Sequence, residues 1–149
     1  MDTKVLTAAL AIAVTLNANA TPESELRPLL DEMIVSANAH DSDRFMALYQ
    51  KSPSLTISFD DMVMTGFDAI LAQQREWWEN GKATPIYAEL VPTRIQPISA
   101  DVSATLQTLE VKAGPNAPAG KRVKLTITSV WKRLPEGWRI VLAHESMTR

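Results

Sequence analysis

Three residues near the end of the sequence, His144, Glu145 and Ser146, have side chains that could carry out chemistry. A serine, a histidine and a carboxylate together form the triad of many hydrolases. The surrounding segment "GWRIVLAHES" is expected to be a strand, in which successive side chains point to opposite faces, so Glu145 cannot orient His144. A nucleophilic serine is also usually presented by a sharp turn of the G-x-S-x-G type, which the sequence lacks. A hydrolase triad is therefore disfavoured.

His144 and Ser146 remain as a pair, because residues two apart share one face of a strand, here together with Trp138. Their Cα atoms are expected about 6–7 Å apart. If this face looks into an apolar pocket, the two residues would supply its polar groups, and His144 could act as a general base near neutral pH. Alternatively, both side chains form hydrogen bonds at the sheet edge or in a dimer contact. The sequence leaves both interpretations open.

Aromatic residues are the other candidates for a pocket wall. Trp78 continues the apolar stripe of a predicted helix, whereas Trp77 lies about 100° away and could edge a pocket mouth or a partner surface. Trp131 lies on the apolar face of a predicted strand, and Tyr49 could present its hydroxyl inward, although each is more commonly a core residue. The predicted ligand-binding set is Tyr49, Trp77, Trp131, Trp138, His144 and Ser146.

Several classes of function are disfavoured by the composition. The two histidines, His40 and His144, are far apart in the sequence, and there is no cysteine, so no metal site is expected. Asp60 and Asp61 are typical of a turn, and an oxygen-ligand site would need more carboxylates nearby. A net charge of −2 also argues against a nucleic-acid partner. No cofactor is expected.

The first twenty residues have the pattern of a secretory signal peptide. A short polar start, "MDTK", precedes the uncharged run "VLTAALAIAVTL", and small residues at Ala18 and Ala20 predict cleavage after Ala20. The apolar run is shorter than the roughly 20 residues that span a bilayer, so no membrane span is expected after cleavage. The alternative is an uncleaved N-terminal helix. We expect a periplasmic or secreted domain of residues 21–149.

Helices are predicted for the first half of this domain. Residues 26–37 place apolar side chains at helical spacing, and Pro28 is expected in or before the first turn because an interior proline would break the helix. A short second helix is expected after a cap at Asp41 or Ser42. A third is expected to begin after Thr65, whose hydroxyl is placed to cap it.

Strands are predicted for the second half, after a short hairpin that begins with "LTISF". Turn residues in "AGPNAPAG" and "LPEG" mark two hairpin loops. The order of elements predicts an α+β fold, in which three N-terminal helices pack on a curved antiparallel sheet and form a cone with an open mouth. The four long strands are expected at residues 86–98, 100–111, 121–133 and 137–147.

Three segments together resemble a known family. "NAHDSDRFMALY", "MVMTGFDAI" and "SVWKRLPEGWRIVLAHES" are similar to the helix–turn–helix opening, the hairpin-to-helix passage and the final hairpin of the SnoaL-like branch of the nuclear transport factor two superfamily. The resemblance spans roughly residues 25–147 and implies the cone-shaped fold. It does not fix a function, because this fold hosts isomerases, dehydratases, cyclases, epoxide hydrolases and non-catalytic modules.

The ketosteroid isomerase relatives provide a test of one activity. Their chemistry needs a tyrosine on the first helix, an aspartate base on the first strand and a protonated aspartate on a later strand. The resemblance places Met33, then Ser58 or Phe59, and then Thr128 at those positions. None carries the required group, so that activity is not expected.

Together, these observations predict an exported domain whose apolar pocket binds a small hydrophobic molecule, and which forms a homodimer through its open sheet. One alternative is an isomerase, cyclase or hydrolase with His144 as general base and Ser146, Tyr49 or Asp60 as helpers. The other alternative is a dimeric association module without a ligand.

Overall fold

The computed structural model describes residues 20–112 and 123–148 of the chain. Most of the predicted signal peptide and the predicted loop at residues 113–120 lie outside the described residues, so both stay predictions. None of the described helices is long and apolar enough to cross a membrane. The helices are α1 (Pro22–Asn38), α2 (Ser42–Met46) and α3 (Phe67–Trp77), followed by a 3-10 turn (Glu79–Gly81). The strands are β1 (Thr56–Phe59), β2 (Met62–Thr65), β3 (Ile86–Pro97), β4 (Val102–Lys112), β5 (Val123–Leu134) and β6 (Gly137–Thr148).

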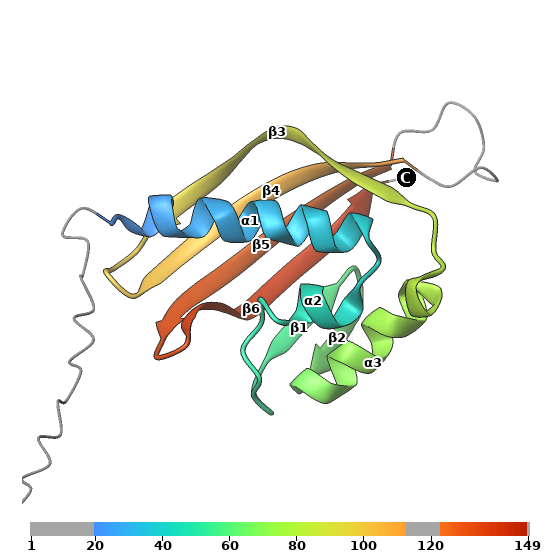
Figure 1. Ribbon diagram of the computed structural model, residues 1–149, viewed down its shortest axis with the longest axis horizontal. Helices are drawn as coiled ribbons and strands as arrows, with labels where there is room; N and C mark the ends of the chain where they lie inside the picture. Colours follow the sequence, from blue (N-terminus) through green and yellow to red (C-terminus); the bar gives the residue numbers. More distant parts are fainter. Residues whose placement is uncertain (1–19, 113–122, 149) are drawn as a thin grey trace, which may run out of the picture.

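The strands form one sheet in the order β2-β1-β6-β5-β4-β3. Its neighbouring strands are antiparallel except β1 and β6, which pair in parallel and join the short N-terminal hairpin to the long strands. Helix α1 lies across the long strands, and α2 and α3 lie beside the short hairpin (Figure 1). The predicted α+β cone is confirmed, with a mixed rather than fully antiparallel sheet.

Helix α1 begins with a capping box, in which the Thr21 hydroxyl accepts the backbone N–H of Ser24 and the Ser24 hydroxyl accepts that of Thr21. The helix therefore starts before the predicted position, and Pro28 lies inside it rather than in its first turn. Ser24, whose carbonyl loses its helical hydrogen bond to residue 28, is exposed, so water can satisfy that carbonyl. The predicted apolar face is confirmed: Leu26, Leu30, Met33 and Ala37 are buried.

Gly66, which has a φ of 95°, is the N-cap residue of helix α3, and no side chain caps this helix. The prediction that Thr65 caps this helix is wrong, because Thr65 is still part of β2, where it pairs with Thr56. The positive φ turns the chain from the strand directly into the helix, and glycine adopts it without steric cost.

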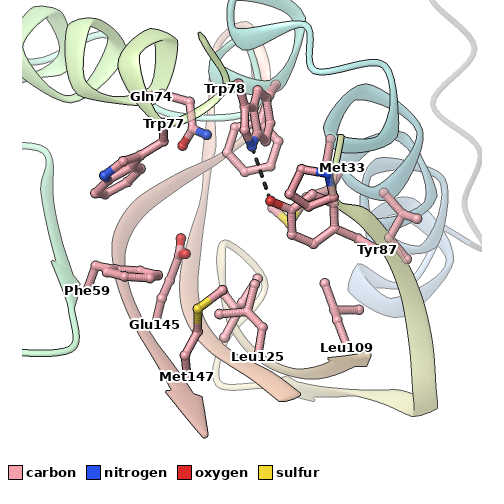
Figure 2. Close-up of a pocket in the computed structure, with 15 residues that line it drawn as sticks. Met33, Phe59, Gln74, Trp77, Trp78, Tyr87, Leu109, Leu125, Glu145 and Met147 are labelled. Atoms are coloured by element: carbon pink, nitrogen blue, oxygen red, sulfur yellow. Dashed lines mark hydrogen bonds between the residues drawn. The ribbon is translucent and has the colours of Figure 1, made fainter. Parts of the chain in front are cut away.

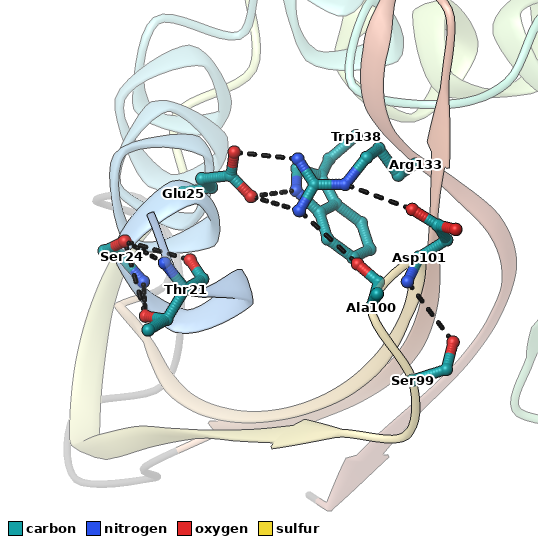
Figure 3. A network of polar contacts seen from close by, with 8 residues as sticks. All are labelled: Thr21, Ser24, Glu25, Ser99, Ala100, Asp101, Arg133 and Trp138. Carbon is teal, nitrogen blue, oxygen red and sulfur yellow. Dashed lines mark hydrogen bonds and ion pairs between the residues drawn. The ribbon is translucent and has the colours of Figure 1, made fainter. Parts of the chain in front are cut away.

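A polar network fastens the start of α1 to the β5–β6 hairpin (Figure 3). The Glu25 carboxylate accepts hydrogen bonds from Trp138 Nε1 at 2.9 Å and from Arg133 Nη1 at 2.8 Å. The Arg133 guanidinium also stacks 4.7 Å from the centre of the Trp138 ring and pairs with Asp101. These hydrogen bonds from Arg133 and Trp138 hold the pKa of Glu25 below its ordinary value.

We expect Glu25→Ala to lower the free energy of unfolding by about 2 kcal/mol at pH 7, because two charge-assisted hydrogen bonds are lost from a partly buried site. A lowered pKa in the folded state means that this stabilisation is present at neutral pH and is lost as the pH falls below 4.5. Urea denaturation at pH 7 and at pH 3.5 measures both effects.

Glu23→Ala is the matched control, because Glu23 lies in the same turn but pairs with Arg27 on the exposed surface. Glu23→Ala should lower the free energy of unfolding much less than Glu25→Ala does. Equal losses for the two variants would show that the network does not fasten the helix.

Candidate functional site

One extra residue in β6 decides which side chains face the helices. Val130 pairs with Leu142, but the next residue of β5, Trp131, pairs with Ile140, so Val141 has no partner in the ladder. Such a β-bulge shifts the alternation of side chains by one residue. Side chains after the bulge therefore point to the opposite face from the one that the pattern before it predicts. Before the bulge, Trp138 and Ile140 are buried under the helices.

Beyond the bulge, Ala143, Glu145 and Met147 point toward the helices, whereas His144 and Ser146 point to the other face of the sheet. Glu145 and Met147 line the principal cavity in the described part of the chain, and neither His144 nor Ser146 does. The prediction that His144 and Ser146 share the inner face with Trp138 is therefore wrong. The reason is the bulge, because two-residue alternation across it no longer holds.

The cavity has a volume of about 340 Å³ and is bounded by α1, α3 and the inner face of the sheet. Most of its wall is aliphatic, aromatic or thioether, and the polar side chains in it are Gln74, Tyr87 and Glu145. The lining residues are Met33, Ile34, Ala37, Phe45, Phe59, Gln74, Trp77, Trp78, Pro85, Tyr87, Leu109, Leu125, Ile127, Glu145 and Met147.

Glu145 is the acidic residue of this wall. In Figure 2 its carboxyl group points away from the strand into the space bounded by Phe59, Trp77 and Trp78. Within the described part of the chain, that carboxyl group has no hydrogen bond or ion pair, whereas the backbone carbonyl of Glu145 accepts the N–H of Asp60. Burial among apolar side chains raises the pKa of Glu145 to about 7, because the charged form loses its hydration.

Aromatic rings from three elements surround this carboxyl group. Phe59, at the end of β1, lies 5.1 Å from the ring of Trp77, at the end of α3. Trp78, the C-cap residue directly after α3, donates a hydrogen bond from Nε1 to the hydroxyl of Tyr87, on β3, at 3.2 Å. Because Trp78 is almost fully buried and Trp77 is not, the pair divides into an inner wall and a rim, as the helical spacing predicts.

The remaining predicted site residues lie in the core rather than in the cavity wall. Trp131 is fully buried and donates from Nε1 to Thr105 Oγ1 at 3.0 Å, and Trp138 donates to Glu25. Tyr49 is buried beside Phe45, and its hydroxyl has no partner among the described residues. Of the predicted ligand-binding set, the cavity wall therefore contains Trp77.

Glu145 was missed because nothing in the sequence marks the bulge. Leu142 is apolar and continues the phase of Trp138 and Ile140, so the pattern reads as an uninterrupted strand, yet the Leu142 side chain is 48% exposed. In the described residues, no three histidine, aspartate or glutamate side chains gather as metal ligands.

The sequence matches the family model of the SnoaL-like domain over residues 26–149. Similar solved structures include a nuclear transport factor 2-like superfamily protein from Salmonella enterica, 18% identical, with a TM-score of 0.70 over 85% of this chain and 91% of that one. Another is a protein of unknown function from Shewanella oneidensis, 17% identical, with a TM-score of 0.69 over 85% of this chain and 99% of that one.

A third similar structure, from Thiobacillus denitrificans, is described as a calcium/calmodulin-dependent protein kinase type II association domain. It is 19% identical, with a TM-score of 0.64 over 87% of this chain and 96% of that one. No curated protein matches the sequence. At these identities the solved structures show the fold alone, and the family match covers nearly all of the described domain. The resemblance in the sequence is thus confirmed, and the chain belongs to the SnoaL-like domain family, with the nuclear transport factor 2-like fold.

Proposed function

We propose that this protein binds a small, largely apolar molecule that carries one polar group, in the cavity that Glu145 faces. The observation that carries the proposal is the single carboxyl group, without a partner among the described residues, in an otherwise apolar wall. A cavity of about 340 Å³ lies in the range of ligand pockets, which are mostly apolar with a few placed polar groups. An ionisable group in such surroundings costs stability, which a ligand that pairs with it would restore.

A second candidate function is general acid–base catalysis by Glu145. A pKa of about 7 favours it, because a group with that pKa both holds and releases a proton near neutral pH. Tyr87 accepts a hydrogen bond from Trp78 and keeps its own proton to donate to a substrate oxygen. Proton abstraction beside a carbonyl group would fit this pair and would serve an isomerase or a cyclase. His144 has no part in this candidate, since it lies on the other face of the sheet.

We also propose that two copies associate through the outer face of the sheet. Leu106 on β4 and Leu142 on β6 are 42% and 48% exposed there, and Val130 on β5 pairs with Leu142. Exposed apolar side chains on adjacent strands favour contact with a second apolar surface. The similarity to a structure described as an association domain supports the same proposal.

The cavity is tested by the neutral fluorescent probe N-phenyl-1-naphthylamine. Trp77→Ala should weaken its binding about fivefold, because part of the aromatic wall is lost. His144→Ala should leave its affinity unchanged, since His144 faces away from the cavity. Fluorescence titration of the two variants and the wild type measures these affinities. Absence of binding to the wild type, or equal effects of both substitutions, would contradict the proposed site.

The cost of burying Glu145 predicts an unusual pH dependence. Its raised pKa means that the folded state holds the proton more tightly than the unfolded state, so stability falls as the pH rises from 4.5 through about 7. Glu145→Gln removes this penalty and should be about 1–3 kcal/mol more stable than the wild type at pH 8.5, with little difference at pH 5.

Urea denaturation at the two pH values checks this expectation. The matched control is Glu136→Gln, the same change at an exposed position in the turn between β5 and β6. A stability difference for Glu145→Gln that does not depend on pH would show that its carboxyl group is not desolvated.

Association is tested by Leu142→Asp, which places a charge in the proposed contact and should convert a dimer into a monomer in sedimentation velocity. Val63→Asp is the control, because Val63 is 68% exposed on β2, away from that contact. A wild-type protein that sediments as a monomer at tens of micromolar would refute the dimer.

A further inference from the structure

We propose that the ligand of this cavity is a lipophilic amine, bound as its ammonium ion between the Glu145 carboxylate and the aromatic rings around it. This inference rests on the proposed function and adds the chemical class of the molecule. It follows from the charges that line the cavity, from those that surround it, and from the nature of its wall.

The charges of the wall are not balanced. Its residues include one carboxylate, from Glu145, and no lysine, arginine or histidine. Tyr87 is the other titratable residue, and burial raises its pKa further above the ordinary value, so it stays neutral. An ionised Glu145 therefore has no countercharge within the wall, and a ligand has to supply one.

The elements packed around Glu145 do not supply a cation either. On the β1 side, the Asp60 carboxylate accepts the backbone N–H of Met147 at 2.9 Å and adds a second negative charge near the end of β6. Tyr49, which follows α2, is neutral, because burial raises its pKa well above the ordinary value. His40 packs against Trp78 outside the cavity wall, where its Nε2 lies 2.7 Å from the carbonyl oxygen of Pro85.

The other elements present neutral groups to Glu145. Its partner on β5 is Ile127, α1 contributes Met33, Ile34 and Ala37, and Gln74 on α3 carries an uncharged amide. The described side chains that line the cavity are thus neutral apart from the carboxyl group of Glu145. They would repel an anionic ligand and attract a cationic one.

The aromatic wall favours the same class of ligand. The faces of Phe59, Trp77 and Trp78 carry the negative part of the ring quadrupole, and an ammonium ion near such faces is stabilised most strongly where water is excluded. The apolar remainder of the cavity, with Leu109, Leu125 and other aliphatic side chains, suits a hydrocarbon body. An ammonium group next to Glu145 also favours its ionised form, so binding releases the proton that Glu145 holds below neutral pH.

The test compares 2-naphthylmethylamine with 2-naphthylmethanol, which has the same aromatic body and no charge, by isothermal titration calorimetry. At pH 8 the wild type should bind the amine at least tenfold more tightly than the alcohol. Glu145→Gln should abolish this preference by weakening the amine alone, and Glu136→Gln should retain it. Between pH 8 and 5.5 the amine should lose about 30-fold in affinity, because only the ionised fraction of Glu145 binds it.

The outcomes separate this inference from the proposed function. Equal binding of amine and alcohol to the wild type, or an amine affinity unchanged by Glu145→Gln, overturns the cationic ligand and leaves the apolar pocket standing. If amine, alcohol and N-phenyl-1-naphthylamine all fail to bind, the proposed function itself fails. The wild-type comparison of the two naphthyl compounds does not depend on how well any variant folds.

Discussion

The site depends on a single unpaired residue in the sheet. Val141 has no partner on β5, and the side chains that follow it on β6 therefore point to the opposite faces from those that regular alternation would give. Without this bulge, His144 and Ser146 would face the helices and Glu145 would face the outside. With it, one strand contributes Trp138 and Ile140 to the core and then Glu145 to the cavity. The composition of the pocket is therefore fixed by pairing geometry and not by residue type alone.

Two glutamates show how the same side chain takes different roles in this domain. Glu25 accepts hydrogen bonds from Arg133 and Trp138, and its pKa is lowered, so its charge contributes to holding α1 on the sheet. Glu145 lies among apolar side chains, its pKa is raised, and its charge opposes folding. The paired carboxylate stabilises the fold. The unpaired one lowers its stability, and ionisable groups with such perturbed pKa values are usually found at functional sites.

The sequence was sufficient for the fold but not for the site. Repeating patterns predicted the buried face of α1, the inward position of Trp131 on β5 and the separate roles of Trp77 and Trp78, because each depends on periodicity within one element. The errors occurred at positions where pairing with a neighbouring strand, and not the local sequence, decides the structure. Thr65 is held in β2 by pairing, and Glu145 is turned inward by a mismatch between two strands. Neither event leaves a mark in the local residue pattern.

The parallel pairing of β1 with β6 has a consequence for how the cavity forms. These strands are far apart in the sequence, and they meet at the place where Phe59 and Glu145 enter the cavity wall. Contacts between distant parts of a chain carry a loop-closure cost and form slowly. Strands β3, β4 and β5 can pair through contacts between segments that follow one another in the chain, but the cavity wall is complete only after β6 has docked. The complete cavity wall is therefore a property of the finished fold, because Glu145 and Met147 enter it only with β6.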